Sequence, residues 1–328
     1  MEKPVVSFVT PMKEKDYRVL GLLKSIRSQD YPQDRIEILI IDGGSNPDVL
    51  KVCKEYGAKI YFNEKGLAEG TGMGKDQGIW KSQGKYIVIA ESDIELIGTD
   101  WINRMITPLE ENPDLFASVP RLYVNRKDNI VNRYLSYVGV DPFAIYRALD
   151  AQLALGLVKT EDMGSYYRVR IDKKEPYCMG SNGFCFRKDL INIVGDYAQD
   201  VEFIARITKA GILYFAIPKG AYIFHKNVKG FNDFLKKRIR WTRNYTKVYI
   251  HEKKNFVWIT KKSSFLLYVL KNLLILPNLP VAIKKMIYYK DVCWLLHPPM
   301  LFITTSINIF FSLQSKNMMR EVLGKNER

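Results

Sequence analysis

Short apolar segments alternate with amphipathic segments along the first 92 residues, and this alternation limits the possible folds more than any other feature. Continuous apolar strands that alternate with helices indicate a parallel sheet covered on both faces. We therefore expect an α/β fold with a mostly parallel sheet flanked by helices. The expected strands are residues 5–10, 36–42, 58–62 and 85–92, and the expected helices are residues 17–28, 47–56 and a segment ending near residue 82.

Polar residues cluster where three of these strands end. Ligands of open α/β sheets bind at the carboxyl ends of the strands. This edge is therefore the expected binding site. The residues are Thr10 and Pro11 after the first strand, Asp42, Gly43, Gly44 and Ser45 after the second, and Glu91, Ser92 and Asp93 after the fourth.

A glycine-rich loop, EGTGMGKDQG at residues 69–78, precedes the third helix. It is not a phosphate-binding P-loop, because Asp76 follows Lys75 where that motif needs Ser or Thr. It is not a dinucleotide fingerprint either, since it follows three strands and its last glycine interval is one residue too long. Neither motif explains the loop, so its role has to be inferred from the segments around it.

Positive charge is concentrated in the last third of the chain. The net charge is +15, and from Lys219 onward 21 Lys and Arg face 5 Asp and Glu. Two long apolar runs, residues 265–283 and 292–313, lie in the same region. Basic residues beside apolar runs indicate an anionic membrane surface as a partner. Their interleaving makes nucleic acid the weakest alternative.

Three lysines between the runs, Lys284, Lys285 and Lys290, argue against export of a hairpin loop across a membrane. Prolines interrupt both runs. We therefore expect monotopic or re-entrant attachment of the C-terminal region, with transmembrane attachment left open. No apolar leader segment precedes the first strand, and the four cysteines form no CxxC pair. The expected location is the cytoplasmic face of the cell membrane.

Seven motifs follow one another in a familiar order. They are SFVTP, IIDGGSN, the glycine-rich loop, KYIVIAESDIEL, GSNGFCFRKDLI, QDVEFIARITKAG and RIRW. This series resembles the family-two glycosyltransferases of the GT-A fold. The resemblance implies a catalytic domain at residues 1–243, with a nucleotide-sugar half (1–119) and an acceptor half (120–243). Residues 244–328 then form the membrane-associating region.

The resemblance implies that Asp42 binds the uracil of a UDP-sugar and that Lys75 faces the diphosphate. Thr10, Pro11, Gly43 and Ser92 complete the expected donor site. The family has arginine at the position of Lys75. A planar guanidinium, which can donate two parallel hydrogen bonds, is therefore replaced by a compact ammonium group. Without a ligand, DGGSN would be an ordinary Asx turn and Lys75 a solvated lysine.

The resemblance also implies a divalent cofactor, Mn²⁺ or Mg²⁺, held by Asp93. Glu91 stands where the family has the first aspartate of its Asp-x-Asp motif, and Glu95 is an alternative for part of that role. His225 ends a late strand, where many GT-A enzymes place a histidine that completes the metal shell. His251 and His297 are expected to be structural.

Catalysis is implied for Asp200, the counterpart of the aspartate that deprotonates the acceptor hydroxyl in inverting members. Gln199 departs from the glutamate before it, and a helix cap is the alternative role for Asp200. Arg240 and Trp241 match the end of the QxxRW motif and are expected to contact phosphate and sugar. Lys237 replaces its glutamine.

The expected function is an inverting, metal-dependent glycosyltransferase. It would move a sugar from a nucleotide sugar, with UDP-sugar preferred, to a hydroxyl of a lipid-linked or polysaccharide acceptor at the membrane. The partners are thus a nucleotide-sugar donor, a glycan or glycolipid acceptor and a membrane surface. Two alternatives stay open, a polyprenyl-phosphate sugar synthase and a non-catalytic nucleotide-sugar- or membrane-binding module.

Overall fold

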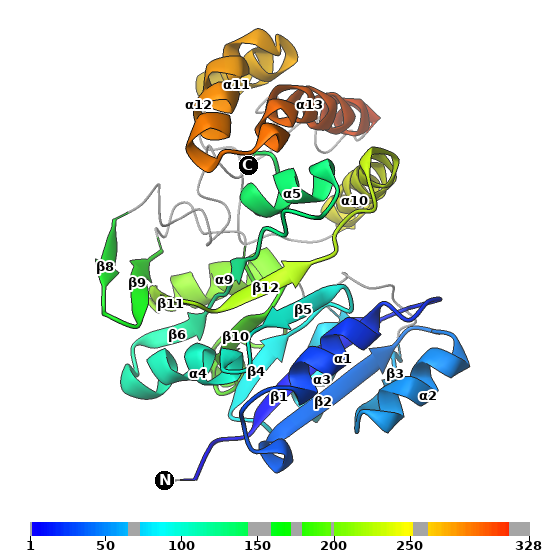
Figure 1. Ribbon diagram of the computed structural model, residues 1–328, viewed down its shortest axis with the longest axis vertical. Coiled ribbons are helices and arrows are strands. Elements are labelled where there is room, and N and C mark those ends of the chain that lie inside the picture. Colours follow the sequence, from blue (N-terminus) through cyan, green and yellow to red (C-terminus); the bar gives the residue numbers. More distant parts are fainter. Residues whose placement is uncertain are drawn as a thin grey trace. The chain divides into compact units, whose positions relative to one another are not determined.

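The computed structural model describes residues 2–64, 73–143, 159–171, 179–197, 200–251 and 262–314 (Figure 1). The chain forms two compact units. The first comprises Met1–Tyr123 and Ile145–Lys226, and the second comprises Val124–Ala144 and Asn227–Arg328. The second unit therefore begins earlier in the chain than the region 244–328 that the sequence predicts as membrane-associating.

The first unit is built on a nine-stranded sheet with the order β3-β2-β1-β4-β10-β6-β11-β9-β8. Its strands are β1 (Val6–Met12), β2 (Ile36–Asp42), β3 (Lys59–Phe62), β4 (Tyr86–Ile89), β6 (Leu115–Ser118), β8 (Thr160–Asp162), β9 (Tyr166–Arg170), β10 (Phe184–Arg187) and β11 (Tyr214–Pro218). The helices of this unit are α1 (Val19–Arg27), η1 (Gln33–Arg35), α2 (Pro47–Glu55), α3 (Met73–Lys81), α4 (Trp101–Glu111), α8 (Leu190–Val194) and α9 (Asp200–Lys209).

The first four strands of the large sheet are parallel, as the sequence predicts. β1 pairs with β2 from Val6↔Ile36 to Met12↔Asp42, and with β4 from Val6↔Tyr86 to Val9↔Ile89. Every residue of β1, β2 and β4 is buried, which explains their continuous apolar sequences. The sheet as a whole is mixed, because β10 runs antiparallel to both of its neighbours, β4 and β6. The expectation of an α/β fold with helices on both faces is confirmed.

Two apolar cores cover the two faces of the large sheet. One core packs α1, α2 and α4 against it, with the fully buried Trp101 at its centre. The other packs α3, α8 and α9 against the opposite face, where the ring of Phe186 stacks on Tyr197 and meets Phe203 edge-on. Cys53, Cys185 and Cys293 are free and buried, in keeping with a packing role, whereas Cys178 lies outside the described residues.

A second, three-stranded sheet also belongs to the first unit. It has the order β5-β12-β7, formed by β5 (Ile94–Ile97), β12 (Tyr222–His225) and β7 (Arg121–Leu122). β12 pairs antiparallel with β5, so that His225 lies opposite Ile94. This pairing brings the end of β12 next to the loop that follows β4.

The glycines of the loop at residues 69–78 have a packing role where the structure describes them. Gly74 and Gly78 lie one turn apart on α3 and face β1 and β2. A Cβ at Gly74 would be 3.0 Å from Cβ of Pro11, and a Cβ at Gly78 would be 2.3 Å from Cγ1 of Val9. The helix therefore approaches the sheet more closely than a side chain at either position would permit.

The second unit is helical. Its elements are α5 (Ile130–Tyr137), α10 (Phe231–His251), α11 (Lys262–Leu273), η2 (Leu276–Asn278), α12 (Leu279–Tyr289), η3 (Val292–Leu296) and α13 (His297–Gln314). Tyr134 is central to it, since its ring packs edge-on against Trp294 and its hydroxyl bonds Nδ1 of His297 at 2.7 Å. His297 thus has the structural role that the sequence predicts.

Within the described residues, the helical segment Val292–Gln314 is long enough and apolar enough to cross a membrane. Of its most apolar stretch of 18 residues, 44% is buried inside the protein. The segments Leu266–Leu273 and Leu276–Tyr289 pass the same test together but are bent by 95° at the break between them.

We expect Gly78→Ala to lower the free energy of unfolding by about 1 to 3 kcal/mol, because its Cβ would overlap a core strand that cannot move aside. Gly21→Ala is the matched control. There the Cβ would be 2.1 Å from Oε1 of Glu95, but this is the end of a flexible side chain. The control should remain within about 1 kcal/mol of the parent. Urea unfolding curves measure both, and equal losses would contradict the packing role of Gly78.

Candidate active site

Asp42 closes a turn at the end of β2. Its Oδ1 accepts a hydrogen bond from the backbone N–H of Ser45 at 2.8 Å, and the side chain is almost fully buried. The N–H of Gly43 donates to the carbonyl of Met12 at 2.8 Å, which joins this turn to the end of β1. Hydrogen bonds within the chain therefore form this turn, as the alternative interpretation of DGGSN states. The turn uses Oδ1, and the role of Asp42 toward a nucleobase stays a prediction.

Glu14 connects this turn to the loop after β4, although the sequence gives no sign of it. The hydroxyl of Ser92 donates to Oε1 of Glu14, and the backbone N–H of Glu14 donates to Oγ of Ser45 at 2.8 Å. Glu14 is buried, and Ser92 is fully buried. The resemblance places Ser92 in the donor site, while the structure shows it as a link between two loops at this edge.

Thr10 and Pro11 lie in β1 beside these loops. Thr10 is fully buried, and within the described part of the chain its Oγ1 has no hydrogen-bond partner. Pro11 packs toward Gly74 of α3. Both residues are therefore at the expected edge, and their contact with a donor stays a prediction.

Asp93 and His225 are brought together by the small sheet. Oδ1 of Asp93 lies 3.2 Å from Nε2 of His225, and Oδ2 lies 3.9 Å from a terminal nitrogen of Arg18. The backbone N–H of Lys226 donates to the carbonyl of Asp93 at 2.9 Å, which fixes the two chain segments against each other. Both Asp93 and His225 are buried to more than nine-tenths.

A carboxylate and an imidazole at this separation form a donor set that fits a divalent cation. Within the residues that the structure describes, no three His, Cys, Asp or Glu side chains are grouped so that they could hold a metal ion together. Oxygens of a ligand would suit the remaining positions of a coordination shell. The oxygens of a diphosphate suit this purpose.

Lys75 lies between two carboxylates. Its Nζ is 2.9 Å from Oδ1 and 3.2 Å from Oδ2 of Asp200, and 3.1 Å from Oε1 of Glu91. The Lys75 side chain is 4% exposed, compared with 31% for Asp200. Burial disfavours the charged form of Lys75, yet the charges of Asp200 and Glu91 outweigh it and raise the pKa of Lys75 above its usual value. Lys75 is thus a buried ammonium ion, not a solvated lysine.

The backbone around Asp200 is held by the loop before β10. The hydroxyl of Tyr197 donates to the carbonyl of Gly180, and Oδ1 of Asp76 accepts from the N–H of Tyr197 at 2.8 Å. Gly180 has a φ of 123°, and a Cβ there would lie 2.9 Å from Cβ of Asp200. Oε2 of Glu91 accepts from the N–H of Asn182 in the same loop. The motif GSNG therefore donates a hydrogen bond to the carboxylate of Glu91 and lies close to Cβ of Asp200.

Arg240 and Trp241 lie on α10 of the second unit, where both are exposed. Lys237, in place of the glutamine of QxxRW, donates to the carbonyl of Asn227 in the same unit. The roles of Arg240 and Trp241 toward phosphate and sugar stay predictions. Gln199 lies outside the described residues.

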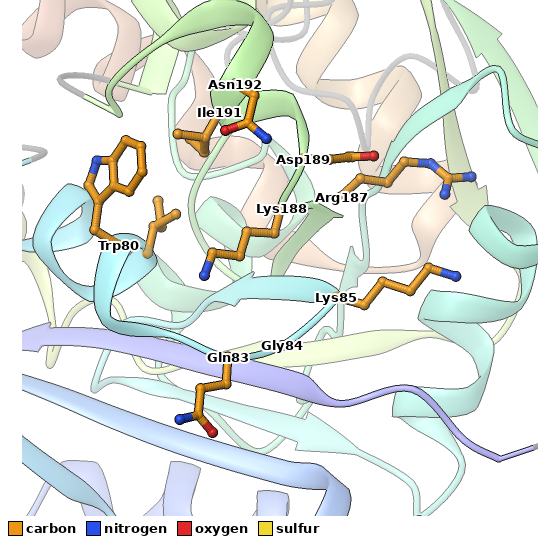
Figure 2. Close-up of a pocket in the computed structure, with 10 residues that line it drawn as sticks. Trp80, Gln83, Gly84, Lys85, Arg187, Lys188, Asp189, Ile191 and Asn192 are labelled. Atoms are coloured by element: carbon orange, nitrogen blue, oxygen red, sulfur yellow. The ribbon is translucent and has the colours of Figure 1, made fainter.

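A pocket of about 410 Å³ lies elsewhere on the first unit (Figure 2). It is lined by residues before β4 and after β10, which is the opposite edge of the sheet from Asp42 and Glu91. Its basic side chains are already bonded. Lys188 donates to the carbonyl of Ser82, and Arg187 donates to the carbonyl of Leu115. This pocket is therefore separate from the candidate active site.

The family model described as Glycosyl transferase family 2 matches residues 7–193, more than half of the chain. The chain belongs to glycosyltransferase family 2. Its match with glucosyl-3-phosphoglycerate synthase of Petrotoga mobilis is 34% identical over 99 residues, and covers 29% of this chain and 30% of that relative.

Two solved structures have a similar fold. A mannosyltransferase from Pyrobaculum calidifontis in complex with GDP-Man and Mn²⁺ aligns with a TM-score of 0.55 at 13% identity, covering 94% of this chain and 88% of that chain. Residues 1–349 of Staphylococcus aureus TarS in complex with UDP-GlcNAc align with a TM-score of 0.50 at 12% identity, covering 97% and 92%. These likenesses show the GT-A-like fold of the family 2 enzyme.

We expect Lys75→Met to lower the free energy of unfolding by about 1 to 3 kcal/mol, because it leaves the carboxylates of Asp200 and Glu91 without their shared donor. Urea unfolding measures the change. Lys51→Met, at an exposed position of α2, is the control and should change little. An unchanged stability of Lys75→Met would show that Lys75 does not stabilise the two carboxylates.

Proposed function

We propose that this family 2 glycosyltransferase is an inverting, divalent-metal-dependent enzyme that moves a sugar from a nucleotide sugar to an acceptor hydroxyl. The observation that carries the proposal is the buried ammonium of Lys75, which holds Asp200 against Glu91 at the edge where β1, β2 and β4 end. A candidate base is thereby fixed beside the candidate donor site. A base for the acceptor and a bound donor are both needed for direct displacement at a sugar carbon.

The donor would bind along the edge formed by Thr10, Asp42 and the loop after β4. A carboxylate oxygen of Asp42 outside the turn is suited to accept an N–H from a nucleobase. A UDP-sugar is our preferred donor. The solved relatives hold GDP-Man in one case and UDP-GlcNAc in the other, so both nucleotides belong in a donor panel.

Asp93 and His225 would hold Mn²⁺ or Mg²⁺ together with the donor diphosphate. When bound, the ion supplies charge stabilisation for the departing nucleoside diphosphate. The guanidinium of Arg18 lies near the second carboxylate oxygen of Asp93 and adds a positive charge to this site. The likeness to a Mn²⁺-containing structure supports this choice of cofactor.

Asp200 would accept the proton of the acceptor hydroxyl. With both carboxylates ionised, Asp200, Glu91 and Lys75 together carry one excess negative charge. Uptake of one proton by Asp200 leaves a balanced pair of Lys75 and Glu91. Asp200 is therefore the group that we propose takes up the proton of the hydroxyl. An ionised phosphate acceptor, as in a polyprenyl-phosphate sugar synthase, would have no proton to give.

The acceptor is proposed to be a lipid-linked or polysaccharide hydroxyl. Asp200 is about one-third exposed, which leaves its carboxylate accessible to a second substrate, whereas Lys75 beneath it is not. Arg240 and Trp241 remain candidates for contact with phosphate and sugar.

Asp93→Ala should abolish Mn²⁺-dependent donor turnover while leaving the fold intact, because Asp93 lies in a loop and contributes little to the apolar core. Calorimetric titration of Mn²⁺ in the presence of UDP should show the loss of metal binding independently of activity. Asp48→Ala, at an exposed position of α2, should behave as the parent. Full activity of the parent in EDTA would contradict metal dependence.

Asp200→Asn should reduce transfer by about 10² to 10⁴, because the amide keeps the size of the side chain but cannot accept the proton. UDP binding, measured by calorimetry on the same preparation, should change little. Glu202→Gln, on the same turn of α9, is the matched control and should retain most of the activity. Undiminished transfer by Asp200→Asn would favour a phosphate acceptor.

A further inference from the structure

Apolar side chains occupy most of the solvent-exposed positions from α11 through η2 to α12 in the second unit. Surface helices of globular proteins place polar residues at such positions. Leu267 is 69% exposed, Leu276 70%, Ile287 67% and Tyr288 75%. We call the whole set the elbow surface, and it consists of Leu266, Leu267, Leu270, Leu274, Leu276, Ile283, Ile287 and Tyr288.

The exposed apolar residues repeat with helical spacing. On α12 the exposed pair Ile287 and Tyr288 follows the exposed pair Ile283 and Lys284 by four residues, so the two pairs share one face. On α11 Leu266 and Leu270 are one turn apart. Each helix therefore presents an apolar stripe, which marks an interaction surface.

The charge around the elbow surface has a single sign. Residues 262–314 contain five lysines and one acidic residue, Asp291. Asp291 is buried and pairs with Arg133 at 2.9 Å and with Arg126 at 3.1 Å, so its charge is neutralised inside the unit. Lys284 and Lys290 are exposed beside the apolar stripe. This charge complements an anionic lipid surface, whereas a second copy of the chain would bring lysines against lysines.

The shape of the two helices determines how deeply they can insert. At about 1.5 Å per residue, α11 and α12 are about 18 and 17 Å long, too short for a hydrocarbon core of about 30 Å. The 95° bend between them prevents the pair from acting as one straight span. The exposed Tyr288 and Lys284 are residue types that anchor at the headgroup level.

Packing within the unit separates α13 from this surface. Its fully buried residues include His297 and Thr304, and Thr305 is also buried. α13 packs against α10 and α11. α13 is thus in part a core helix of the second unit, although Phe302, Phe310 and Leu313 are exposed on it, and the exposed leucines of α11 point away from that core.

We propose that the elbow surface is a monotopic docking site for one leaflet of an anionic bilayer. The leucines and isoleucines enter the acyl boundary, and the lysines contact phosphate headgroups. The surface acts without the catalytic residues of the first unit. The proposal is therefore independent of the donor, the metal and the acceptor.

The test is co-sedimentation of the full chain with vesicles of phosphatidylcholine alone, and with vesicles that also contain phosphatidylglycerol. Leu267→Gln combined with Ile287→Gln should weaken binding to the anionic vesicles at least about tenfold. Ile193→Gln is the matched control, since Ile193 is 60% exposed on α8 of the first unit. It should bind as the parent does.

The charge contribution is tested by Lys284→Gln, which should weaken binding about fivefold on anionic vesicles and little on neutral ones. Lys51→Gln on α2 is its control. Circular dichroism on each variant checks that it is folded. Equal sedimentation of the parent and the double variant would overturn the proposal. So would a parent dimer that the double variant converts to a monomer while vesicle binding is unchanged.

Discussion

The parallel pairing of β1 with β2 and β4 is the constraint on which the first unit depends. It places Met12 opposite Asp42 and Val9 opposite Ile89, so that the polar residues following all three strands meet at one edge. A shift of one residue in either pairing would turn the buried side chains of β1 toward the wrong core. The position of the candidate donor site therefore follows from the burial of apolar strands, and not from any contact made by the polar residues themselves.

The fold could be predicted from the sequence because its signals are local. Runs such as IEILIID are apolar on both faces, and Pro47 after Asn46 marks a helix start, where the side chain of Asn46 accepts from the N–H of Asp48. The antiparallel insertion of β10 between β4 and β6 could not be read in this way, because strand order depends on contacts between distant segments. The same applies to the pairing of β9 with β11, which are also distant in the chain.

Some residues of the candidate site could be predicted and others could not, because only some of them lie in recognisable motifs. Asp93, His225 and Asp200 were found because motifs mark them, although their roles stay predictions. Glu14 and Arg18 were missed, since a single acidic or basic residue in a loop carries no pattern. Lys75 was expected to face a diphosphate, and in the structure it pairs with Asp200 and Glu91. These partners are 125 and 16 residues away, a separation that no local pattern can reveal.

The small sheet has a consequence for the spacing of the two candidate metal ligands. Asp93 directly precedes β5, His225 ends β12, and these strands are joined by backbone hydrogen bonds with His225 opposite Ile94. The spacing of the two backbones is thus set by the strand pairing, and the side-chain rotamers place the carboxylate and the imidazole from there. In the proposed cation site, a change in this pairing would change the distance between the two candidate ligands. Substitutions in β5 or β12, away from the candidate site itself, would then reach Asp93 and His225 through the backbone.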